Sequence, residues 1–156
     1  MNAESRFILS QGFDEPAPES CGLHFVALQF QPRVIGIILV AGMILQTVAR
    51  VPSIALFAML GAVLCWGALL PDANVFEWAY NLTSPRYKLT RAPAPRRFAQ
   101  ALAGSMAFAI AALLSMHWML AAIVVELLLL AAVAGILFAK FCFGSWLYHH
   151  LFSPRR

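Results

Sequence analysis

Two long apolar segments, separated by one polar passage, dominate this sequence. Residues 34–70 are largely apolar with one charged residue, Arg50, and residues 98–139 are largely apolar with one charged residue, Glu126. As a single helix the second segment would be about 63 Å long, twice the hydrocarbon core of a bilayer, which is about 30 Å. Each segment must therefore fold back, and the spans must be helices because a bilayer offers the backbone no water. The sequence predicts an all-α membrane protein with four transmembrane helices as two antiparallel hairpins, plus short interfacial helices.

The composition excludes an ordinary soluble domain. Hydrophobic residues make up 62% of the chain and charged residues 12%, whereas charged residues are about a quarter of a soluble domain. A net charge of +4 is compatible with nucleic-acid binding, but the basic residues flank apolar runs, as they do in membrane proteins. The expected partner is therefore the lipid bilayer, and no nucleic acid is expected.

The apolar runs divide the chain into five parts. These are a cytoplasmic or interfacial N-terminal segment (1–31), a first transmembrane hairpin (32–70), a basic cytoplasmic loop (71–97), a second transmembrane hairpin (98–140) and an interfacial C-terminal segment (141–156).

The finer boundaries follow from length and from turn-forming residues. Residues 23–30 are apolar but too few to cross a bilayer, so they are expected at the interface, with the first span at 34–49. The turns are expected at residues 50–53 and 115–118. Within the loop, Asp72 is expected to cap an interfacial helix over residues 73–82.

The loop charges predict the threading. Ten of the eleven Lys and Arg residues fall in or directly beside the two terminal segments and the central loop, where Arg33 and Lys140 are the two that lie beside them, and Arg50 alone falls in the turns. Because basic residues concentrate on the cytoplasmic side of membrane proteins, both termini are expected in the cytoplasm.

The two halves of the chain share a short pattern. Trp78-Ala-Tyr80 is followed by Ser84-Pro85-Arg86, and Trp146-Leu-Tyr148 is followed by Ser153-Pro154-Arg155. One explanation is a parallel internal repeat, which would give a pseudo-two-fold axis along the membrane normal. The other is that Trp and Tyr favour membrane interfaces irrespective of ancestry. Both explanations remain open.

Four motifs carry a resemblance to a known family: Pro32-Arg33, the run at 76–81, Ala-Pro-Arg-Arg-Phe-Ala-Gln at 94–100, and Phe-Cys-Phe-Gly-Ser-Trp-Leu-Tyr at 141–148. Over residues 31–151 the chain resembles a bacterial inner-membrane family described only as domain of unknown function 4395. The resemblance implies the same topology and a bacterial inner-membrane location, and it implies no activity. In many relatives it also implies a second cysteine after the glycine, where this chain has Ser145.

Glu126 is the most conspicuous candidate site residue. A carboxylate within a membrane span is costly unless it is paired, so such acids are functional candidates. Its expected role is a structural tie to the first hairpin through hydrogen bonds with Gln46 or Arg50, a proton or ligand site, or a contact with a partner subunit. We expect Glu126 to lie in an intramembrane polar layer with four other residues: Arg50, Gln46, Thr47 and His117.

Cys142 is the candidate reactive thiol. It lies close to Lys140 in the sequence, and a neighbouring cation favours the thiolate. Packing and lipid modification are the alternatives for this cysteine. His149 and His150 point about 100° apart on a helix and cannot both ligate one ion, so no metal is expected. The sequence also predicts no cofactor and no catalytic residue.

A ladder of small residues predicts how the helices pack. Small side chains let helix backbones approach closely within a membrane. The ladder consists of Ala99, Ala103, Ala107 and Ala111, and its expected partners are Ala58 and Ala62 or else Gly135.

Three functions fit these features. The favoured one is a non-catalytic integral-membrane accessory or scaffold subunit of a larger assembly, with other membrane subunits or further copies of the chain as partners. The first alternative is a thiol/redox-linked membrane protein that works with a thioredoxin-like protein. The second is a small proton-coupled transporter.

Overall fold

The computed structural model describes residues 3–14, 17, 19–84 and 88–152 of the chain, and within them every regular element is helical. The elements are α1 Ala3–Ser10, α2 Cys21–Val48, α3 Arg50–Leu69, the 3-10 helix η1 Pro71–Ala73, α4 Val75–Thr83, α5 Ala94–Ser115, α6 Met119–Phe138 and α7 Phe143–Phe152. Four of them (α2, α3, α5 and α6) are long and apolar enough to cross a membrane. The predicted all-α membrane fold with four spanning helices is confirmed.

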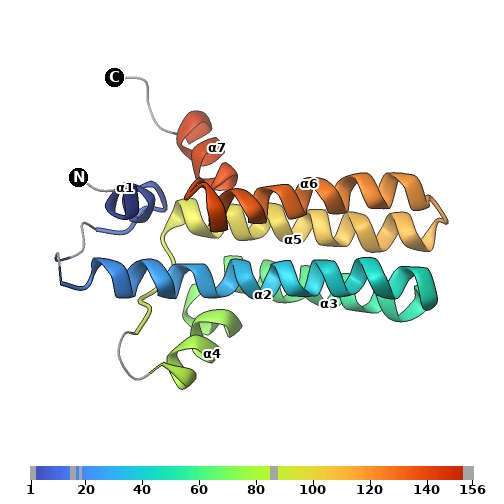
Figure 1. The fold of residues 1–156 in the computed structure, drawn as a ribbon, viewed down its shortest axis with the longest axis horizontal. Helices are drawn as coiled ribbons and strands as arrows, with labels where there is room; N and C mark the ends of the chain where they lie inside the picture. Colours follow the sequence, from blue (N-terminus) through green and yellow to red (C-terminus); the bar gives the residue numbers. More distant parts are fainter. Residues whose placement is uncertain (1–2, 15–16, 18, 85–87, 153–156) are drawn as a thin grey trace.

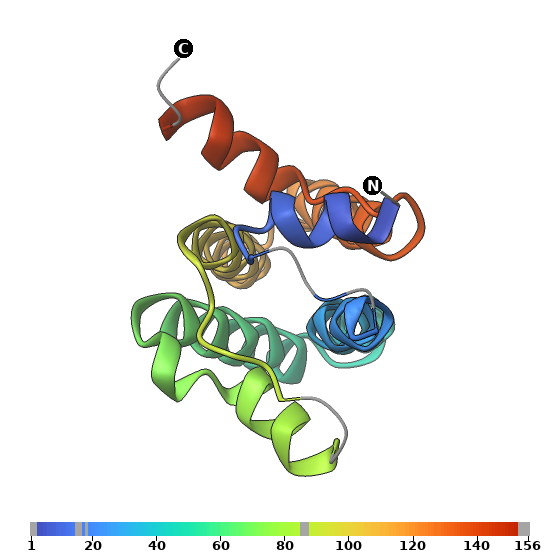
Figure 2. The same cartoon turned by 90° about the vertical axis from the view of Figure 1, so that its left-hand side faces the viewer.

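The four long helices form a bundle in which each packs against two others (Figure 1). The chain reverses direction between α2 and α3 at Ala49, and between α5 and α6 at residues 116–118. The most extensive packing joins α3 to α5. The end view in Figure 2 shows the four helices side by side.

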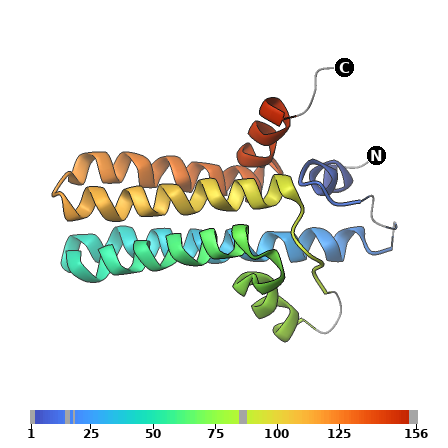
Figure 3. The same ribbon diagram turned by 180° about the vertical axis from the view of Figure 1, so that it is seen from behind.

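The two ends of the bundle differ in structure (Figure 3). Helices α1, α4 and α7 all lie at one end, which we call the loop end. The two reversals lie at the other, which we call the turn end. Loops that are far apart in the sequence therefore meet at the loop end.

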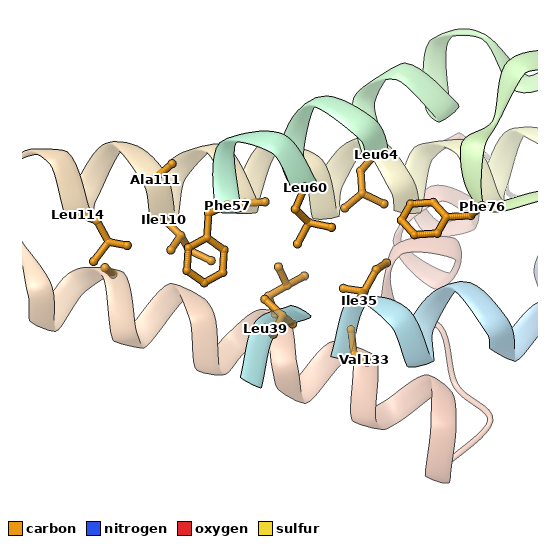
Figure 4. Close-up of a cluster of buried hydrophobic side chains, with 13 residues drawn as sticks. Ile35, Leu39, Phe57, Leu60, Leu64, Phe76, Ile110, Ala111, Leu114 and Val133 are labelled. Carbon is orange, nitrogen blue, oxygen red and sulfur yellow. The ribbon is translucent and has the colours of Figure 1, made fainter. Parts of the chain in front are cut away.

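The bundle core is a continuous cluster of aliphatic side chains with one phenylalanine at its centre (Figure 4). Phe57 and Leu64 of α3 face Leu39 of α2 and Ile110 of α5, and all four are at most 1% exposed. The ring of Phe57 lies so close to Gly42 that a Cβ there would be 2.4 Å from Cζ. Close packing of this kind fixes how α2 and α3 lie against each other.

The first spanning helix begins earlier than the sequence predicted. We expected a span over 34–49 with a separate interfacial segment before it, but α2 runs unbroken from Cys21 and contains Pro32. A proline inside a helix removes one backbone hydrogen bond. Packing offsets this loss, since Phe25 and Leu28 are buried in a second cluster at the loop end. At about 42 Å, α2 is longer than the bilayer core.

The second cluster also contains α1, an element that the sequence did not predict. Phe7 and Ile8 of α1 are 1% and 0% exposed, and the ring of Phe7 meets that of Phe25 edge-on at 5.5 Å. The N-terminal segment is therefore packed against α2 in its described part.

The cap of the loop helix was assigned to the wrong residue. Asp72 lies in η1, and the side chain of Asn74 accepts a hydrogen bond from Phe76 N at the start of α4. Asp72 instead makes an exposed ion pair with Arg91 at 3.5 Å. The single turn of η1 lies between α3 and α4. The residue that caps α4 is therefore Asn74, two residues after Asp72.

Two glycines, rather than the predicted alanine ladder, make the closest contact between α5 and α3, and Ala99 of the ladder instead meets Gly144 of α7. A Cβ on Gly104 would lie 2.7 Å from Cys65 Sγ and 3.1 Å from Gly61 O. Ala107 and Ala111 of the predicted ladder are buried nearby. Cys65 thus lies where the two backbones approach most closely.

The proposed repeat is visible in part. Each pair of long helices is followed by a short helix, and these short helices carry Trp78 with Tyr80 and Trp146 with Tyr148. The Pro-Arg pairs at 85–86 and 154–155 lie outside the described residues. The repeat therefore remains a prediction.

Candidate functional site

Glu126 is buried at the turn end of the bundle. It is 0% exposed and lies about 10 Å along α6 from Met119. Gln46 of α2 donates a hydrogen bond from Nε2 to Glu126 Oε2 at 3.0 Å. The predicted contact between Glu126 and the first pair of helices is present.

Two oxygens of this pair, one from each side chain, have no hydrogen-bond partner among the residues that the structure describes. Both Glu126 Oε1 and Gln46 Oε1 are buried without one. Both are acceptors when the carboxyl is ionised, whereas a proton on Glu126 would supply a donor. The pair therefore has the chemistry to hold one proton.

Arg50, the other expected partner of Glu126, lies beside His117 instead. Its guanidinium lies 2.8 Å from Nδ1 and 3.2 Å from Nε2 of His117. Arg50 begins α3 and His117 lies in the reversal before α6, so both are at the surface of the turn end, while Glu126 is deeper. The guanidinium cation remains at the bundle end, where the cost of its desolvation is lower.

Thr47 does not join the polar layer either. It is exposed, and its hydroxyl donates to Ile44 O of its own helix at 2.7 Å. The five predicted residues thus separate into a buried pair, Glu126 and Gln46, an exposed pair, Arg50 and His117, and Thr47 alone.

A second polar cluster lies at the loop end, and sequence reasoning missed it. Arg96 of α5 is 5% exposed. It donates from Nη1 to Gln11 Oε1 at 3.3 Å and from Nη2 to Gln31 Oε1 at 3.2 Å. Gln100 Nε2 donates to the same Gln31 oxygen at 2.8 Å. We call Arg96, Gln11, Gln31, Gln100 and Glu77 the loop-end cluster.

Glu77 of α4 supplies the negative charge of this cluster. Its Oε1 lies 3.6 Å from Arg96 Nε, an ion pair longer than a hydrogen bond, and both side chains are less than a tenth exposed. Burial raises the pKa of Glu77 above its ordinary value of 4.5, and the charge of Arg96 opposes this rise. The cluster therefore ties α4 to α5, and α5 to the N-terminal part of the chain.

The four-residue spacing of the α5 ladder could have revealed this cluster. The buried face of α5 continues towards the first turn of the helix through Gly104, Gln100 and Arg96, in that order. We counted Arg96 only as a loop charge because it follows Pro93 and Pro95, which read as loop residues. Gln11 carries no comparable signal.

Cys142 is buried just before α7. It is 6% exposed, and Ser145 Oγ donates to its sulfur at 3.3 Å. Lys140, the cation that made it a candidate, instead lies 3.3 Å from Glu4 and over the ring of Phe25. The reactivity of Cys142 remains a prediction.

The paired histidines of α7 lie in different surroundings. His149 Nε2 is 3.0 Å from Ser10 O, and His150 stacks on Trp146 with ring centroids 5.4 Å apart. Across the described residues, no group of three or more His, Cys, Asp or Glu side chains could hold a metal ion.

A cavity of about 650 Å³ adjoins the loop-end cluster. Its walls come from α2, α5, α6 and α7 and are mainly aliphatic, with Ala103 and Ala132 among the small residues. Its polar boundary includes Arg96, Gln100 and Cys142. The volume lies within the range of small-molecule sites, about 300–1,000 Å³.

Comparisons with known proteins agree with the resemblance found in the sequence. Residues 27–152 match the model of the family described as Domain of unknown function (DUF4395). No curated protein and no solved structure matches the chain. The matched range contains all of α3 to α7 and most of α2, and with them Glu126, Arg96 and Cys142. The chain therefore belongs to the DUF4395 family.

Proposed function

We propose that this protein is a non-catalytic accessory or scaffold subunit of a larger membrane assembly. In this role, the outer surface of α3 and α5 packs against a membrane-spanning helix of another subunit. The observation that carries the proposal is the unusual composition of that surface.

The exposed positions of α3 and α5 include a series of small residues, which we call the small-residue face. Ala62 and Ser105 directly follow Gly61 and Gly104, the glycines at which the two helices meet. The face consists of Ala55, Ala62, Ser105, Ala109 and Ala112, all exposed. Small residues at such positions let another helix backbone approach closely.

The outer surface of α6 provides the comparison within the same molecule. Its exposed positions carry large aliphatic side chains, including Leu120 at 78% and Leu128 at 59% exposure. Large aliphatic side chains suit contact with lipid chains, and small ones suit contact with helices. The two surfaces differ in proportion, because α3 and α5 also expose large side chains such as Met59, Trp66 and Phe108. This difference in proportion supports a protein partner on α3 and α5 and lipid on α6.

We also propose that the loop end lies in the cytoplasm and that the membrane is a bacterial inner membrane. The support is the distribution of charge, because Lys88, Arg91, Arg96 and Arg97 lie in or next to the central loop. Among the Lys and Arg residues that the structure describes, only Arg50 lies at the turn end. Such asymmetry favours the cytoplasm for the more basic side.

Purification in a mild detergent tests the accessory role. We expect the wild-type protein to elute in a complex larger than its own 17.1 kDa chain. Ala109→Phe on the small-residue face should release it as a monomer, whereas Val124→Phe, the matched change on α6, should leave the complex intact. Mass spectrometry of the complex then separates a second copy of the chain from another subunit.

Three outcomes would contradict the proposal. A monomeric wild-type protein, or equal behaviour of Ala109→Phe and Val124→Phe, would remove its support. A mixed disulfide through Cys142 as the only association would favour the redox alternative.

A further inference from the structure

Glu126 and Gln46 share one hydrogen bond, and each leaves one oxygen unused. Gln46 Nε2 donates to Glu126 Oε2 at 3.0 Å, while Glu126 Oε1 and Gln46 Oε1 are buried without a partner. The two carboxyl oxygens share one carbon, and so do the oxygen and nitrogen of the amide. One further hydrogen bond between the unused oxygens would therefore close a ring with the first. That bond needs a donor, and neither oxygen carries a hydrogen while the carboxyl is ionised.

A negative charge on Glu126 would have no cation to compensate it within the described part of the chain. No ion pair there includes Glu126. Arg50 contacts His117 at the surface of the turn end. An uncompensated charge inside a membrane bundle is costly, and a buried carboxyl avoids this cost by binding a proton.

The helices packed against α6 offer no charged side chain at this depth. They are α5, α2 and, at the loop end, α7. Apart from Glu126, no charged residue occurs in α6, in residues 34–48 of α2 or in residues 98–115 of α5. The titratable side chains of α7 lie at the opposite end of the bundle (Figure 3). His117 is exposed in the reversal before α6, beside Arg50. Burial and Gln46 therefore decide whether Glu126 binds a proton.

A buried water molecule is the other means of satisfying two acceptors. It needs room and several polar partners, whereas a proton needs no room. Neither Glu126 nor Gln46 borders the cavity of about 650 Å³ or a smaller one of about 360 Å³ between α1 and α7. Glu126 is 0% exposed and Gln46 is 6% exposed. The surroundings of the pair therefore favour a proton over a water molecule.

We propose that Glu126 is a proton-binding site, in which a neutral carboxylic acid and the amide of Gln46 form a ring of two hydrogen bonds. Gln46 Nε2 donates to Glu126 Oε2, and the bound proton on Glu126 Oε1 is donated to Gln46 Oε1. The ring leaves no unpaired oxygen and no charge inside the bundle. One proton thus joins α2 to α6 near the turn end. The site goes beyond the accessory role and does not depend on it, because it lies inside the bundle and the small-residue face lies outside.

Infrared spectroscopy of the purified protein at neutral pH tests the protonation state directly. Carboxylic acids and carboxylates absorb at separate frequencies, and subtraction of the Glu126→Gln spectrum removes the signals of all other carboxyl groups, including Glu77. The variant should fold, because two amides can form the same ring. We expect the difference spectrum to contain the C=O band of one carboxylic acid, at lower frequency in protein prepared in D₂O. Carboxylate bands in its place would overturn the proposal and indicate a bound water or cation.

Substitution of Gln46 tests the ring itself. Gln46→Met keeps the length of the side chain but removes both hydrogen-bonding atoms, so the acid band should move to higher frequency. Thr47→Val is the matched control, because Thr47 is exposed and donates to Ile44 O of its own helix, and it should leave the band in place. If Gln46→Met does not fold, Gln46→Asn, whose amide is one carbon shorter, should also move the band. An acid band that a folded Gln46 variant leaves in place, or that Thr47→Val moves equally, would contradict the ring.

Discussion

Gly61 and Gly104 bring the backbones of α3 and α5 into direct contact. A Cβ on Gly61 would lie 3.0 Å from Gly104 O, and one on Gly104 would lie 3.1 Å from Gly61 O. Helices in lipid gain little from burying apolar surface against each other, so close contact of this kind is a main source of their association. The α3–α5 contact therefore holds the first pair of long helices to the second.

Substitution of Gly104 tests the importance of this contact. Gly104→Leu should destabilise the purified protein by about 1–3 kcal/mol, because the added atoms force two packed backbones apart. Val124→Leu enlarges a side chain on the exposed side of α6, away from this contact and from the small-residue face, and should have little effect. Melting temperatures in one detergent provide the measurement. Equal losses in the two variants would show that the glycine contact is not special.

Substitution of Glu126 distinguishes a structural tie from a proton site. Glu126→Gln should keep its melting temperature, since the amide can still accept from Gln46. Glu126→Leu should lose about 0.5–2 kcal/mol, the range of hydrogen bonds measured within membranes together with the cost of an unpaired Gln46. If Glu126→Gln is as stable as the wild type but abolishes a cellular phenotype, the carboxyl acts through its proton and the transporter alternative gains support.

The buried carboxyl of Glu77 predicts a pH dependence of stability. Burial raises its pKa in the folded protein above 4.5, so between 4.5 and the raised value the folded state binds a proton that the unfolded state has released. Stability relative to Glu77→Gln should therefore be higher at the acidic end of this window and fall as pH rises through the raised pKa. Melting temperatures of both proteins between pH 4.5 and 8 provide the test. A relative stability that rises with pH would contradict the burial of this carboxyl.

The threading can be tested by labelling engineered cysteines in a cysteine-free variant. Thr90 is exposed at the loop end, and Met116 is 60% exposed at the turn end. Ser53 is unsuitable because it is fully buried and donates to Gly42 O. We expect a membrane-impermeant maleimide added outside spheroplasts to label Met116→Cys and leave Thr90→Cys unlabelled. The reverse pattern would place the loop end outside.

The spanning helices were predicted well from the sequence, because the length of each apolar segment decides how many times the chain crosses the bilayer. An apolar run too long for one crossing must turn, and the polar side chains of Ser115 and His117 showed where. The start of α2 was predicted too late in the sequence, because a proline such as Pro32 usually marks the beginning or end of a helix. Only packing against α1 shows why the helix continues through it.

The candidate site was predicted less completely, for two physical reasons. Arg50 was paired with Glu126 because both lie towards the turn end, but the guanidinium remains at the surface beside His117. Arg96 was missed because its burial depends on residues distant in sequence, such as Gln11 at 85 positions away. Hydrophobic periodicity shows neither how deep a side chain lies in the bundle nor which residues distant in the sequence it contacts.

Photo-crosslinking in living cells tests the accessory role most directly. A photoreactive amino acid at position 109 would lie on the small-residue face, and one at position 124 would lie on the lipid-facing side of α6. We predict a discrete protein adduct from position 109, identified as a membrane-spanning chain or a second copy of this one, and none from position 124. Lipid adducts alone at both positions would contradict the accessory role.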